Sequence, residues 1–88
     1  MTNTKTLKNG KVQYFYKGVL LRTSKSFYKY ALVEENESGI RTMKFSNSLE
    51  TINSYFNYLT KGYGTEFENS DLWSSQFHNP EQLKILTF

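Results

Sequence analysis

The stretch FYKYALV at residues 27–33 shows the clearest strand pattern in the chain. Its aromatic and branched side chains are of the kind that β-strands favour. Further strands are predicted on both sides of it, at residues 11–17, 19–23 and 40–45, with short polar turns between them. Residues 11–46 therefore predict an antiparallel sheet of four strands.

After residue 46 the apolar side chains change to helical spacing. Leu49, Ile52, Phe56 and Leu59 recur at intervals of three or four residues, which predicts a helix over residues 47–61. An apolar stripe on a helix needs a partner, and the predicted sheet offers the only large apolar surface. We therefore expect the helix to pack across the sheet.

The two ends of the chain are expected to be less regular. Residues 1–10 are polar, which predicts a flexible lead-in to a single domain over residues 11–88. A short helical turn is expected over residues 69–77, and Pro80 can open another turn because proline fits the first position of a helix. Residues 83–88 predict a tail strand. The fold class that follows is α+β.

Length and composition exclude several classes of protein. Eighty-eight residues suffice for one small domain, and 17% of them are aromatic. There is no cysteine, which excludes disulfides, thiolate nucleophiles and cysteine-ligated zinc. No apolar run is long enough to cross a bilayer and none resembles a signal peptide, so a soluble, cytoplasmic protein is expected with no membrane partner.

Charge is distributed unevenly along the chain. Residues 1–44 hold nine basic and three acidic side chains, a net +6, whereas residues 45–88 hold two basic and five acidic side chains, a net −3. A basic half of this kind can steer the protein toward phosphates or toward an acidic protein surface. The alternative is that these lysines only solubilise strand faces and edges.

Aromatic residues alternate with cations on two of the predicted strands. Single-stranded nucleic acid binds such surfaces, because bases stack on exposed rings while cations follow the backbone. The alternative is that these tyrosines pack against side chains of neighbouring strands. The candidate nucleic-acid-binding residues are Tyr14, Tyr16, Lys17, Arg22, Lys25, Tyr28, Lys29 and Tyr30.

A second candidate surface for binding lies in the C-terminal third of the chain. Phe67, Asp71, Trp73 and Phe77 place aromatic anchors beside acidic charge, a combination that suits a protein interface. The alternative is that the aromatic side chains close the small core.

No arrangement of residues indicates catalysis. His78 is the only histidine, and its acidic neighbours Asp71 and Glu81 make a weak candidate acid–base pair beside a turn. Catalytic carboxylates also need a desolvating pocket that separates their pKa values. We therefore expect a protein that is not an enzyme and has no catalytic residue, metal site or cofactor.

The segment KVQYFYKGVLLRTS at residues 11–24, followed by YKYALV at residues 28–33, resembles small uncharacterised proteins encoded by bacteriophages and prophages of low-GC bacteria. The resemblance covers roughly the first half of the chain. It implies an inhibitor that binds a host defence or nucleic-acid-processing protein such as a nuclease complex in the host cytoplasm, with anti-CRISPR proteins as one example. It assigns no role to any residue.

That inhibitor is the leading functional hypothesis from the sequence. The alternative is a small basic module that binds single-stranded RNA or DNA through the aromatic and lysine residues of the sheet. Both hypotheses are compatible with a monomer or with a homodimer formed by pairing of sheet edges.

Overall fold

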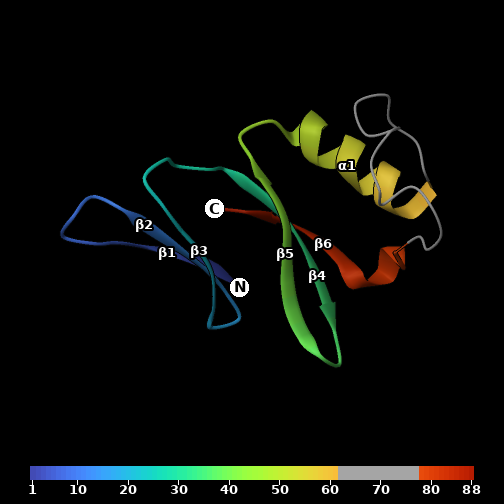
Figure 1. Cartoon of the computed structure of the whole chain (residues 1–88), viewed down its shortest axis with the longest axis horizontal. Coiled ribbons are helices and arrows are strands. Elements are labelled where there is room, and N and C mark those ends of the chain that lie inside the picture. The colour runs from blue at the N-terminus through green and yellow to red at the C-terminus, as the bar shows by residue number, and fades with distance from the viewer. Residues whose placement is uncertain (62–77) are drawn as a thin grey trace.

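The computed structural model describes residues 1–61 and 78–88, which form three layers (Figure 1). The first layer is a three-stranded sheet, called sheet A, of β1 (Thr2–Thr6), β2 (Val12–Tyr16) and β3 (Val19–Ser24), with β2 in the centre. The second, sheet B, places β4 (Tyr30–Asn36) between β5 (Gly39–Ser46) and β6 (Leu83–Thr87). The third is helix α1 (Leu49–Lys61), and a 3-10 turn, η3 (Pro80–Gln82), leads into β6. All strand pairs are antiparallel.

The α+β class and the packing of the helix on a sheet are confirmed, but the expected single four-stranded sheet is wrong. Its four strands exist, yet β3 and β4 belong to different sheets. The reason lies in β4, where Ala31, Leu32 and Val33 are all 0% exposed. A strand that is apolar on both faces needs a layer on each side, and a single sheet under one helix would leave one of those faces in water.

Two apolar cores lie on opposite faces of sheet B. On one face, Ala31 and Val33 pack with Tyr14 and Tyr16 of sheet A. On the other face, Leu32 packs with residues of α1 that include Ile52. Figure 1 shows sheet B between sheet A and α1. The alternation of side chains along β4 therefore joins all three layers.

Both ends of the chain form β-strands, although the sequence predicts a strand only at the C-terminal end. Within residues 1–10, expected to be a flexible lead-in, Thr2–Thr6 forms β1 and pairs along β2. Pro80 opens η3, where the Asn79 side chain accepts a hydrogen bond from the backbone N–H of Glu81. The tail strand is confirmed as β6. The helical turn expected over residues 69–77 lies outside the described residues.

Tyr14 occupies the junction between the two sheets. Its side chain is fully buried, and its ring lies 5.1 Å from that of Phe45 and 5.0 Å from that of Phe88, both in edge-on geometry. Its hydroxyl donates to the carbonyl of Ser26 at 3.0 Å and accepts from the backbone N–H of Tyr28 at 2.8 Å. The same side chain thus fills the core and holds the connection between β3 and β4.

We expect Tyr14→Phe to lower the free energy of unfolding by about 1–3 kcal/mol, because it leaves two backbone groups of the connection without their partner. Urea denaturation followed by tryptophan fluorescence measures this. The matched control is Tyr16→Phe, whose lost partner is a carboxylate oxygen of Glu35 that water can replace, so its effect is smaller. Equal effects of the two substitutions would contradict the proposed role of the Tyr14 hydroxyl.

Candidate functional site

Sheet A carries cations and no acidic residue. Residues 1–33 contain seven lysines and arginines and no aspartate or glutamate, and strands β1 to β3 lie within this segment. The acidic residues whose positions the structure describes lie on other elements: β4, the β4–β5 turn, α1 and η3 hold Glu34, Glu35, Glu37, Glu50 and Glu81. The uneven charge of the sequence therefore becomes a separation of charge between layers.

Two of the predicted binding cations contact groups of the protein itself. Lys17 lies in the two-residue turn between β2 and β3 with φ of +52°, and its Nζ donates to Glu35 Oε2 at 2.6 Å. The Arg22 guanidinium lies 5.2 Å from the ring centroid of Tyr28 and 5.5 Å from that of Phe45, within the range of cation–π attraction. Both side chains help to join sheet A to sheet B.

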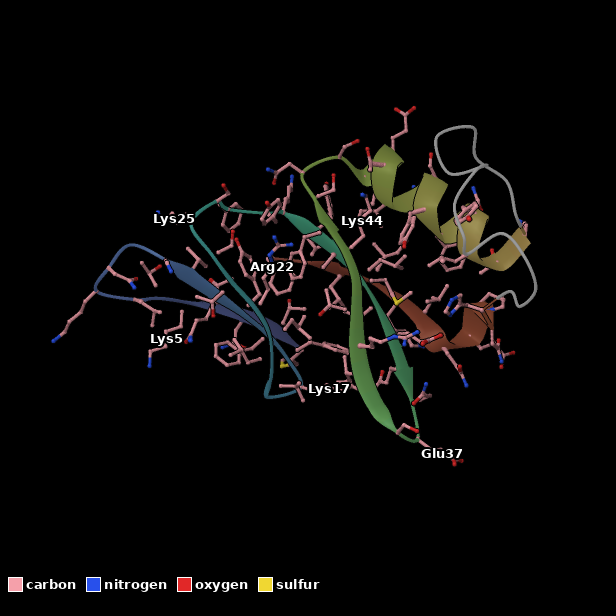
Figure 2. All side chains as sticks on the ribbon, in the orientation of Figure 1. Lys5, Lys17, Arg22, Lys25, Glu37 and Lys44 are labelled. Atoms are coloured by element: carbon pink, nitrogen blue, oxygen red, sulfur yellow. The ribbon has the colours of Figure 1, made fainter. Side chains whose placement is uncertain are left out.

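Four other lysines are available to an external anion. Within residues 1–61 and 78–88, none of them forms an ion pair with an acidic side chain. Figure 2 shows two of them, Lys5 and Lys25, on the part of the molecule remote from α1. The four, which we call the hairpin lysines, are Lys5, Lys8, Lys11 and Lys25.

The β1–β2 hairpin carries three of the hairpin lysines, with Lys5 in β1 and with Lys8 and Lys11 in the turn. The N–H of Leu7 donates to the carbonyl of Lys11 at 2.8 Å, and the Asn9 side chain accepts from the N–H of Lys11 at 3.0 Å. Gly10 has φ of +87°, a conformation that glycine adopts at little cost. Sequence reasoning gave Lys25 a binding role but assigned none to Lys5 and Lys8, because residues 1–10 were expected to be a lead-in, and none to Lys11, which was expected only to begin a strand. The absence of acidic residues before Glu34 is the signal that identifies them.

The structure does not bring the predicted aromatic residues together on an exposed surface. Tyr14 is 0% and Tyr16 is 8% exposed, so neither ring is available to stack on a base. Tyr28 is half-buried beneath Arg22, and Tyr30 is half-buried with the ammonium group of Lys29 5.5 Å from its ring centroid. The predicted stacking surface is therefore wrong for β2, because its tyrosines point toward sheet B.

The predicted protein-binding residues Phe67, Asp71, Trp73 and Phe77 lie outside the described residues. The acid–base candidate His78 is described, and its Nδ1 lies 2.6 Å from Glu34 Oε2. Glu34 lies 44 residues from His78 in the sequence. Of the two acidic partners predicted for His78, Asp71 lies outside the described residues, and the backbone N–H of Glu81 donates to the side chain of Asn79. Sequence spacing gave no sign of the pair of His78 and Glu34.

Glu34 is the one buried charged side chain of the described residues, at 7% exposure. Arg41 Nη2 lies 3.3 Å from its Oε1, and the backbone N–H of His78 bonds to the carbonyl of Leu59 at the end of α1. Burial of a carboxylate is costly unless it is paired and hydrogen-bonded. This cluster therefore connects β4, β5, α1 and the approach to β6.

A shallow pocket of about 440 Å³ lies beside the cluster, at the β4–β5 end of sheet B. Its lining is mostly polar and comes from Glu34, Asn36, Ser38, Gly39, Ile40 and Arg41. His78 is not among the described residues that line it. The Glu34 carboxylate contacts both Arg41, which lines the pocket, and His78, so the cluster joins the pocket wall to the residues that precede β6.

Comparisons with known proteins gave no match, either to protein-family models, to curated proteins or to solved structures. Among the described residues, no helix has the length and apolarity that crossing a membrane requires. No three histidine, aspartate or glutamate side chains of that part of the chain come together as metal ligands would.

The Lys17–Glu35 pair predicts a measurable titration. The hydrogen bond from Lys17 lowers the pKa of Glu35 below its ordinary value of 4.5, and the bond to Glu35 raises the pKa of Lys17 above 10.5. The stability that Glu35 contributes is then present above pH 4.5 and is lost as the pH falls through the lowered value. The contribution of Lys17 is present below pH 10.5 and is lost as the pH rises through the raised value.

We expect Lys17→Met to return the pKa of Glu35 toward 4.5, as measured by NMR titration of the side-chain carboxyl carbon. Lys29→Met is the control, because the Lys29 ammonium group lies over the ring of Tyr30 instead. An unchanged Glu35 titration in Lys17→Met would show that the pair does not form in solution.

Proposed function

We propose that the protein is a non-enzymatic nucleic-acid-binding protein and that sheet A is its binding layer. The observation that carries this proposal is the acid-free segment of residues 1–33, which supplies a complete sheet and, in the hairpin lysines, four cations that have neither an ion pair nor an aromatic ring as partner among the described residues. A nucleic acid is the common polymer with a regular array of negative charge, and lysines that neutralise its phosphates release condensed counterions. On the other layers the described acidic and basic side chains nearly balance, so the attraction of a polyanion is concentrated on sheet A.

The cations indicate what kind of contact dominates. All four hairpin lysines carry a point charge on a flexible stem rather than the planar fork of arginine. Contacts of this kind neutralise phosphate and hold the protein on the polymer, whereas sequence is recognised at the base edges. The hairpin lysines therefore account for affinity, and other side chains of sheet A must account for any selectivity.

A second candidate function is the phage-type inhibitor of a host defence or nucleic-acid-processing protein, of which an anti-CRISPR protein is an example. The observation that favours it is exposed apolar surface on β3, where Val19 is 42% and Leu20 is 49% exposed. Exposed apolar anchors of this kind are typical of protein interfaces. The residues predicted from the sequence to bind a protein partner lie outside the described residues. The charge of sheet A therefore places nucleic-acid binding before the inhibitor.

Fluorescence anisotropy with labelled duplex DNA, single-stranded DNA and single-stranded RNA, each at a series of salt concentrations, tests the proposed function. Each lysine that neutralises a phosphate contributes about −0.9 to the slope of log affinity against log salt on duplex DNA and about −0.7 on a single strand. We expect a duplex slope of about −3 to −4 for four hairpin lysines. The double variant Lys8→Ala/Lys11→Ala should reduce the magnitude of that slope by about 2.

The matched control is Lys61→Ala/Lys84→Ala, which removes the same charge from α1 and β6 and should leave the slope unchanged. Equal slopes for the two double variants, or no binding to any of the three polymers at low salt, would refute the proposed function. Tight inhibition of a purified RNA-guided nuclease without nucleic-acid binding would instead support the inhibitor.

A further inference from the structure

The described outer face of sheet A carries one aromatic ring, that of Phe15, which is half-buried. Proteins that bind single strands stack successive bases on several aromatic side chains. Here Tyr14 and Tyr16 point into the core, and Phe27, at 53% exposure, lies in the connection between the sheets. Phosphate contacts with little stacking favour a polymer whose backbone is already ordered, which is a duplex.

The outer face of sheet A, turned away from sheet B, carries hydrogen-bonding side chains in register. Lys5 of β1 pairs with Gln13 of β2, and Gln13 pairs with Thr23 of β3. Directly paired residues share a face of an antiparallel sheet, and this is the face opposite to Tyr14. A neighbouring row on the same face consists of Asn3, Phe15 and Leu20.

The end of the β1–β2 hairpin extends past the cover of sheet B. Thr4 and Thr6 are exposed because β1 is the edge strand of sheet A, whereas their paired residues Tyr14 and Val12 pack into the core. The turn of residues 7–11 extends past Ser24, the last residue of β3. Figure 1 shows this hairpin projecting from the molecule on the side opposite to α1.

The width of sheet A fits one groove of B-form DNA. Neighbouring strands lie about 4.8 Å apart, so the axes of the three strands span about 10 Å, less than the width of the major groove of about 12 Å. The minor groove, about 6 Å wide, is too narrow for a sheet of three strands. The major groove of an RNA duplex is deep and narrow, and side chains cannot reach its base edges.

We infer that the ligand of sheet A is duplex DNA, with the outer face of the sheet in the major groove; this inference rests on the proposed function. Gln13 lies at the centre of the outer face and contacts base edges, since a glutamine side chain can bond to N6 and N7 of adenine. Phe15 and Leu20 supply apolar contact for the methyl group of thymine. The hairpin lysines flank this face and contact phosphates on both sides of the groove.

The first test compares three polymers of matched sequence by anisotropy at one salt concentration: a DNA duplex, an RNA duplex and single-stranded DNA. We expect the DNA duplex to bind about tenfold or more tightly than either of the others. Dimethyl sulfate footprinting then identifies the groove, because guanine N7 lies in the major groove and adenine N3 in the minor groove. Protection of guanine N7 is expected.

The second test examines Gln13 on a panel of DNA duplexes that differ in sequence. The unmodified protein should show a spread of affinities of about tenfold, which corresponds to one good base contact, and Gln13→Ala should reduce the spread while lowering the mean affinity little. Gln82→Ala, in η3, is the control and should keep the spread.

The outcomes separate the inference from the proposed function. Equal affinity for the RNA duplex or the single strand, protection of adenine N3 alone, or a spread that Gln13→Ala leaves unchanged would overturn the groove assignment while nucleic-acid binding remained. Failure to bind any of the polymers would overturn both. A tenfold preference for duplex DNA with protected guanine N7, lost selectivity in Gln13→Ala and unchanged selectivity in Gln82→Ala would support the inference.

Discussion

The buried side chain of Tyr14 determines how the two sheets of this protein meet. Its ring lies among those of Phe45, Phe88 and Tyr28, which come from β5, the C-terminus and the connection before β4. Its hydroxyl bonds to the backbone of that connection on both sides of Phe27. A buried tyrosine needs a partner for its hydroxyl, and here the partner is the segment that carries the chain from one sheet to the other.

This arrangement gives the two faces of sheet A different side chains. The rings of Tyr14 and Tyr16 point inward and supply the core, so the outer face is left to Lys5, Gln13 and Thr23 and to the row of Asn3, Phe15 and Leu20 beside them. Of the nearby cations, Lys17 and Arg22 are held by Glu35 and by aromatic rings. The hairpin lysines remain without such partners among the described residues. They lie in the β1–β2 hairpin and directly after β3. Packing and binding thus depend on alternate side chains of the same strands.

Sequence reasoning predicted local structure well and pairing between distant segments poorly. Strand and helix periodicity located β2 to β5, α1 and β6 within a few residues, because each pattern is a property of a short window. The composition of β1, mainly threonine and asparagine, has no apolar alternation, and only its pairing with β2 makes it a strand. The position of β6 beside β4 depends on contacts between residues about fifty apart, which no local pattern records.

The sequence predicted that the candidate site is basic, but it did not predict which of its tyrosines are buried. The basic character of the first half follows from counting residues, whereas the choice of which tyrosine face is buried requires knowledge of the second sheet. Period-two alternation defines two faces and does not say which one meets another layer. In the same way, the pair of His78 and Glu34 joins residues 44 positions apart and exists only because β6 returns beside β4.

The most direct test of the central claim, that sheet A is the binding layer, is an NMR titration of the isotope-labelled protein with a short DNA duplex. The account predicts that backbone amide shifts change for the β1–β2 hairpin and for β3, including Lys8, Lys11 and Thr23. Residues of α1 and β6 should stay unchanged. Shift changes centred on α1, on β6 or on residues 62–77, with the hairpin unaffected, would contradict it.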